Sequence, residues 1–367
     1  MKFLISLFAA LTLAACSVFS VGAEESFDMS AVYDALSDDA LNSLQRIGAN
    51  SANADELSSL SFEKIIGEIA QTAENNAAPP LKGLISITAI LLICSMLSVY
   101  KGSLSSGVSD AINITAALCI SGAVVVPAVE LIGNASQLIV TASNVMLAYV
   151  PAVVTLMLSS GGAVSSASYY TAVLAAGEGV CQLSSRLLAP FMNLFLGLSV
   201  TSGISPEIHL EGLIQTVSKA ARWLLTFAMT IFTAVLGVKQ VITSSLDTVS
   251  NRAVRFAVGS FVPVVGSALS EAYNTVRGSV SILKSGLGVF AIIAVAAVFM
   301  PVIIRSVMWI VTLWLGKSVA EVLGLPQCAG LLGGVSAVLS TLLAVVLCVM
   351  SIYIISSAVA LLLGGGA

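Results

Sequence analysis

Long apolar runs with very few charged residues constrain the fold of this chain more than any other feature. Several runs after residue 80 approach the roughly 20 residues that a helix needs to cross a bilayer. Hydrophobic residues make up 57% of the sequence and charged residues only 9%, whereas soluble domains are about 45–50% apolar and about 25% charged. The predicted fold class is therefore all-α: a polytopic helical membrane protein with about seven to nine transmembrane or re-entrant segments and a small exported helical segment at its N-terminus.

The apolar runs are irregular, because glycine or proline interrupts several of them and some are shorter than a full span. Such interruptions are tolerated where protein or a water-filled cavity surrounds the backbone, and they recur in transporters. The candidate segments are 81–100, 111–131, 138–158, 169–186, 187–200, 223–238, 256–269, 287–304, 307–323 and 331–363. Segments 169–186 and 187–200, interrupted by Pro190, form either one kinked span or a span with a re-entrant piece. Together they define a multi-span membrane domain over residues 81–367.

The N-terminus has the features of an export signal. Lys2 precedes an apolar run of residues 3–15, and Val21-Gly22-Ala23 offers small residues for cleavage, which predicts a signal peptide over residues 1–23. Leu13-Ala14-Ala15-Cys16 also resembles a lipobox, so lipidation at Cys16 is the competing interpretation. Either route exports the segment that follows.

Residues 24–80 form an acidic segment that we expect on the extracytoplasmic side. Eleven acidic and two basic residues lie between Glu24 and Pro80. Pro79-Pro80 is predicted to end this segment, and Lys101 then falls on the inner side, as the positive-inside rule favours. Two amphipathic helices are expected from apolar residues at helical spacing, the first with Val32, Leu36, Leu41, Leu44 and Ile47, the second capped by Ser61 and carrying Phe62, Ile65, Ile66 and Ile69. They form either a solvated connector or a docking surface for partners.

The sequence offers little for enzyme chemistry. His209 is the only histidine, which excludes a histidine-based metal cluster, and no cofactor is expected. Gly316-Lys317-Ser318 resembles the end of a phosphate-binding loop, but Val311 stands where the motif needs glycine and the surroundings are helical. No basic tract suggests nucleic acid binding. We expect a protein that is not an enzyme and that works in the lipid bilayer, with energy from an ion gradient or a partner.

Charged residues within apolar runs are the more informative candidates, because ionisable groups in a membrane are costly and mark pathways or interfaces. Glu178 and Arg186 lie on one candidate segment. Lys317 and Glu321 are four residues apart and can pair on one helix face. Arg305 is interpreted as a residue that extends toward the membrane surface. Gly330 and Gly334 form a GxxxG motif, which predicts close packing within the protomer or in a homo-oligomer.

The most distinctive stretch runs from Asn251 to Gly288. It begins with Asn251-Arg252-Ala253-Val254-Arg255-Phe256-Ala257-Val258-Gly259-Ser260-Phe261-Val262-Pro263-Val264-Val265-Gly266 and continues through Ala268-Leu269-Ser270-Glu271-Ala272, Thr275-Val276 and Leu283-Lys284-Ser285-Gly286-Leu287-Gly288. Arg252 and Arg255 are one turn apart and can bind lipid phosphates or an acidic partner. Phe261 to Gly266, with Pro263, is either a kinked helix or a re-entrant, pore-lining hairpin. Glu271 follows it as a further candidate interface residue.

This stretch resembles the signature of the stage III sporulation protein AE family of endospore-forming bacteria, with Ser260 where asparagine is expected and Arg255 where lysine is usual. The resemblance implies a membrane subunit of a channel or secretion-like complex that joins the mother cell to the engulfed forespore and sustains late forespore gene expression. It implies a place in the mother-cell membrane, with other stage III sporulation membrane proteins and a cytoplasmic secretion-type ATPase as partners. It implies no catalytic residues. The alternative function is a stand-alone ion-coupled transporter of small solutes, which Glu178 and the interrupted helices permit.

Overall fold

The computed structural model describes residues 30–49, 62–99, 106–159, 163–183, 188–204, 212–221, scattered positions from 223 to 249, and 266–362. Within these residues the chain is helical and contains no strand. The helices are α2 (Ser30–Ala35), α3 (Asp38–Ile47), α5 (Phe62–Val99), α6 (Ser106–Ser159), α7 (Ala163–Leu183), α8 (Ala189–Ile204), α10 (Gly266–Val322) and α11 (Pro326–Leu362). The predicted signal peptide lies outside the described residues.

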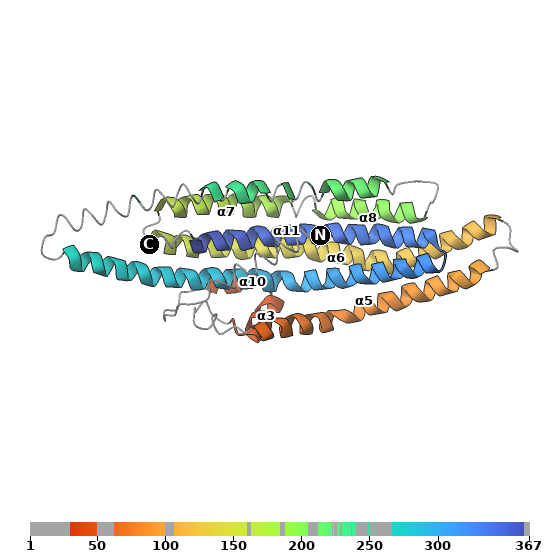
Figure 1. Cartoon of the computed structure of the whole chain (residues 1–367), viewed down its shortest axis with the longest axis horizontal. Coiled ribbons are helices and arrows are strands. Elements are labelled where there is room, and N and C mark those ends of the chain that lie inside the picture. Colours follow the sequence, from red (N-terminus) through yellow and green to blue (C-terminus); the bar gives the residue numbers. More distant parts are fainter. Residues whose placement is uncertain are drawn as a thin grey trace.

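The long helices lie side by side in an elongated bundle (Figure 1). α10 and α11 form an antiparallel hairpin and are the most deeply buried pair in it. Gly324, with a φ of +71°, ends α10, and the Leu325 amide donates to the Ala320 carbonyl at 2.9 Å. This glycine-terminated turn satisfies backbone groups at the helix end and reverses the chain.

The apolar segments combine into fewer, longer helices than the sequence pattern suggested. Four of the described helices are long and apolar enough to cross a membrane: Glu63–Leu97, Ile114–Ser159, Gly286–Val322 and Pro326–Leu361. The predicted count of seven to nine segments is not confirmed. Residues 132–137, between two predicted segments, contain no proline and continue the helix as part of α6. Arg305 likewise lies inside α10, where its long side chain is compatible with helix.

The boundary at Pro79-Pro80 is not a break in secondary structure, because α5 runs through both prolines. Proline removes a backbone donor and crowds the preceding turn, so such a helix needs support from a neighbour. α10 packs along this part of α5, and the Thr312 hydroxyl donates to the Pro80 carbonyl at 3.4 Å. The acidic segment and the first apolar span are thus joined in one rod.

Candidate functional site

The acidic segment packs onto the bundle through the face that the sequence predicted. Val32, Leu36, Leu44 and Ile47 are buried, and Leu41 is partly buried beside them. Both ends of α3 are capped. The Ala40 amide donates to the Ser37 hydroxyl at its start, and Gly48, with a φ of +90°, ends it.

An aromatic contact fixes where this segment lies. The Tyr33 ring of α2 packs on the Phe290 ring of α10, with centroids 5.4 Å apart and planes at 57°. Tilted aromatic pairs at this distance are favourable beyond their buried area. α2 also contacts α6, and α3 contacts α5 and α10. The acidic segment is therefore an integral part of the bundle rather than a free connector.

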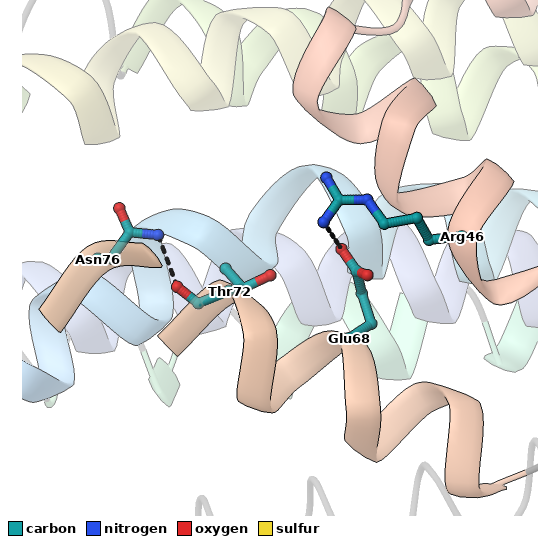
Figure 2. A network of polar contacts seen from close by, with 4 residues as sticks. All are labelled: Arg46, Glu68, Thr72 and Asn76. Carbon is teal, nitrogen blue, oxygen red and sulfur yellow. Dashed lines mark hydrogen bonds and ion pairs between the residues drawn. The ribbon is translucent and has the colours of Figure 1, made fainter. Parts of the chain in front are cut away.

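An ion pair joins α3 to α5. Arg46 Nη1 lies 3.5 Å from Glu68 Oε1 (Figure 2). The Glu68 side chain is only 3% exposed, whereas that of Arg46 is 43% exposed. Because a buried carboxylate without a counter-charge is costly, the contact with Arg46 favours the burial of Glu68 at this position.

The ion pair lies on a different face of α5 from the one that the sequence predicted to be buried. Ile66 and Ile69, expected on a buried apolar face, are exposed, while Glu68 and Thr72 are buried. The physical reason is that the contacts with α3 and α10, rather than the isoleucines, decide which face of α5 turns inward. Ser61, the expected cap, lies outside the described residues.

A second set of polar contacts joins α5 to α10. Arg305 donates from Nε and Nη2 to Asn76 Oδ1, at 3.1 and 2.7 Å. Asn76 in turn donates from Nδ2 to the Thr72 carbonyl one turn earlier, at 2.7 Å (Figure 2). Both amide atoms of Asn76 are thereby used, which fixes its orientation toward α10.

Small and large residues alternate along the same contact. A Cβ added to Gly83 would lie 2.7 Å from the Trp309 ring, and one added to Gly316 would lie 3.1 Å from Ile87. The α5 residues Asn76, Pro80, Gly83 and Ile87 and the α10 residues Arg305, Trp309, Thr312 and Gly316 both follow a 4-3-4 spacing. That spacing is typical of helices packed in a coiled-coil-like manner, here side by side and parallel.

We call Arg46, Glu68, Thr72, Asn76 and Arg305 the polar junction. The polar junction is suited to holding α3, α5 and α10 in register. It consists of the ion pair between Arg46 and Glu68 and the hydrogen bonds that Asn76 makes with Arg305 and with the Thr72 carbonyl. In the part of the chain that the structure describes, no group of three metal-ligating side chains comes together. The chemistry available at the junction is hydrogen bonding and charge pairing, which makes it a structural interface between the acidic segment and the membrane helices.

The structure describes few of the residues that the sequence singled out. Glu178 lies in α7, and Gly266 and Glu271 lie in the first turns of α10, but their side chains are outside the described set. Arg186, Arg252, Arg255, Phe261 and Pro263 also lie outside the described residues. Their roles in a pathway or interface remain predictions.

Other sequence candidates are placed by the structure. Lys317 Nζ lies 3.7 Å from Glu321 Oε1, so the expected pair on one helix face is present. A Cβ on Gly334 would lie 3.1 Å from Ser199 Cβ of α8. This glycine of the GxxxG motif therefore serves packing within the protomer.

Sequence reasoning did not identify Asn76 as the partner of Arg305. The signal that identifies them is the matching 4-3-4 spacing, which sets Asn76 and Arg305, and likewise Ile87 and Gly316, at equivalent positions of the two helices. The spacing on one helix alone does not identify these residues, because the 4-3-4 pattern is informative only when α5 and α10 are compared.

Comparisons with known proteins match most of the residues that form this bundle. A family model described as stage III sporulation protein AE matches residues 50–364. The stage III sporulation protein AE of Bacillus subtilis (strain 168) is 28% identical over 181 residues, which cover 49% of this chain and 45% of that relative. The match thus spans less than half of the relative's length. No solved structure matches the chain.

Proposed function

Because the chain belongs to the stage III sporulation protein AE family, we propose that it is a membrane subunit of the channel or secretion-like complex that joins the mother cell to the forespore. A role in sporulation follows from the family itself. The single observation that carries the proposal is the family match over residues 50–364, which includes the four described helices that are long and apolar enough to cross a membrane.

The architecture supports a role as an assembly component. The acidic segment is held against the membrane helices by the polar junction, and Asp34, Asp38 and Asp39 on α2 and α3 are exposed. Such a fixed, charged surface suits contact with other subunits outside the cytoplasm. We place the protein in the mother-cell membrane, with this surface extracytoplasmic, beside other stage III sporulation membrane proteins.

A partner ATPase is proposed as the source of energy. Gly316-Lys317-Ser318 lies within the continuous helix α10 and so does not form the loop that cradles a phosphate. A cytoplasmic secretion-type ATPase would supply this energy. The alternative of a stand-alone transporter is not favoured by the family.

Deletion of the gene in its endospore-forming host tests the proposal. Engulfment is expected to proceed, late forespore-specific reporter expression is expected to fall, and the intact gene supplied in trans should restore it. Normal late forespore expression in the deletion strain would contradict the proposed function. Affinity isolation from sporulating cells should recover the ATPase and the other membrane subunits, and isolation of this chain without them would contradict the proposed assembly.

A further inference from the structure

Two tyrosines on neighbouring helices bury their hydroxyl groups inside the bundle. Tyr149 of α6 is 1% exposed and Tyr169 of α7 is 2% exposed. Neither hydroxyl has a hydrogen-bonding partner among the described residues. A buried hydroxyl that forms no hydrogen bond loses its interaction with water and gains nothing in exchange, so these two groups require a partner.

The two tyrosines belong to one site, because α6 and α7 form an antiparallel hairpin (Figure 1). α6 ends at Ser159 and α7 begins at Ala163, so residues equally far from these ends lie at the same level. Tyr149 is ten residues before Ser159 and Tyr169 is six residues after Ala163, a difference of about one turn. The two hydroxyl groups are near enough to interact electrostatically.

A third buried hydroxyl without a partner comes from α11. Ser357 is completely buried, and its Oγ makes no hydrogen bond in the part of the chain that the structure describes. The serines near it behave differently: Ser351 and Ser356 each donate to the carbonyl four residues earlier, both at 2.8 Å. Ser357 does not use this common bond to its own helix, so its hydroxyl can bind a partner that lies between the helices.

The hydrogen bond between Ser143 of α6 and Tyr353 of α11 sets Ser357 beside the tyrosines. α6 and α11 run in the same direction, since α6 is antiparallel to α5, α5 is parallel to α10, and α10 is antiparallel to α11 (Figure 1). Ser357 is four residues beyond Tyr353 and Tyr149 is six residues beyond Ser143, so the two lie within about 3 Å of the same level. Four residues is about one turn, so Ser357 shares the face of α11 that Tyr353 turns toward α6. α7 contacts both of these helices.

The helices around these hydroxyls carry no charge at this level. Residues 131–159 of α6, 163–177 of α7 and 326–362 of α11 contain no Asp, Glu, Lys or Arg, and Glu178 is about 13 Å of helix beyond Tyr169. An ion without a counter-charge is strongly disfavoured in such surroundings. A neutral molecule that both donates and accepts hydrogen bonds suits a set of hydroxyls, since each can do either. Water is such a molecule, and it satisfies buried polar groups where roughly two to four partners surround it.

We propose that α6, α7 and α11 enclose a hydration site, in which bound water is hydrogen-bonded to the hydroxyls of Tyr149, Tyr169 and Ser357. Each hydroxyl thereby regains the hydrogen bond that burial removed. Buried water of this kind is part of the structure, and here it links α7 to the two helices on which α7 packs. The inference concerns the interior of the bundle and does not depend on the proposed function.

X-ray hydroxyl-radical footprinting of the full-length protein in detergent micelles tests for the water directly. Radiolysis of a bound water modifies the side chains beside it, and mass spectrometry after digestion measures the modification. Tyr149 and Tyr169 should be modified although both are buried, whereas the buried rings of Phe195 and Phe299 should stay unmodified. If either tyrosine were modified no more than these phenylalanines, the proposal would be overturned.

Removal of single hydroxyl groups gives a second test. Tyr149→Phe and Tyr169→Phe should each lower the melting temperature, because the bound water loses a partner, and footprinting of Tyr169→Phe should show less modification of Tyr149. Tyr170→Phe is the matched control, since Tyr170 is 40% exposed and its hydroxyl can be solvated from outside the bundle; its melting temperature should not change. An unchanged or raised melting temperature in Tyr149→Phe or Tyr169→Phe would overturn the proposal, because removal of a hydroxyl that is buried without any partner is expected to stabilise the protein.

Discussion

At the scale of residues, Asn76 is the centre of the polar junction. Replacing it with alanine removes the acceptor of two hydrogen bonds from Arg305 and leaves that half-buried guanidinium without this partner. We expect Asn76→Ala to lower the free energy of unfolding by about 1–2 kcal/mol, within the range for hydrogen bonds to charged groups and for polar contacts between membrane helices. Thermal unfolding of the protein in detergent micelles measures the change.

The matched control is Asn75→Ala, an exposed position one residue earlier on the same helix. It makes the same chemical change and should leave the melting temperature close to that of the parent. Equal melting temperatures for the two variants would show that the contact with Arg305 does not stabilise the bundle.

The pair Arg46 and Glu68 gives a second prediction at this scale. Arg46→Ala leaves a buried carboxylate without its counter-charge, whereas Glu68→Gln removes the charge and keeps the shape. We expect Arg46→Ala to destabilise the protein by roughly 1–3 kcal/mol and the double variant Arg46→Ala, Glu68→Gln to recover part of that loss. A double-mutant cycle by thermal unfolding measures the coupling, and strictly additive effects would exclude an energetically significant pair.

At the scale of elements, the packing of α8 on α11 depends on a glycine. A Cβ added to Gly203 would lie 2.4 Å from Leu331 Cβ and 2.8 Å from its Cα, too close for side-chain adjustment alone. We expect Gly203→Ala to separate the two helices and to lower the melting temperature, because overpacking forces the backbone to move.

Gly197 on the same helix provides the comparison, since a Cβ there meets nothing within 4 Å. Gly197→Ala should be neutral or stabilising by up to about 1 kcal/mol, as expected for alanine in place of glycine inside a helix. If Gly203→Ala were tolerated as well as Gly197→Ala in the same melting experiment, the described contact with Leu331 would be incorrect.

The helices also show which parts of the fold could be predicted from the sequence. Apolar spacing predicted helices throughout and identified the buried residues Val32, Leu36, Leu44 and Ile47, as the structure confirms. It did not predict that Pro79-Pro80 would lie inside α5, because the support for that helix comes from α10, more than 200 residues away in the sequence. It also treated Arg305 as a separator between spans, since its partner Asn76 is visible only once the two helices are paired.

At the scale of the whole molecule, composition predicted the helical membrane class, and the residues of the 252–288 signature indicated the family whose model matches residues 50–364. Composition did not predict the number of crossings, because a buried apolar helix and a lipid-exposed one have similar sequences.

We propose that this membrane protein acts from the mother cell to sustain gene expression in the forespore. The most direct test places the gene, in a deletion strain, under a promoter active only in the mother cell or only in the forespore, and measures a late forespore reporter. We expect that expression in the mother cell restores the reporter and that expression in the forespore does not. Restoration from the forespore alone, or from neither compartment when the protein is present at normal levels, would contradict it.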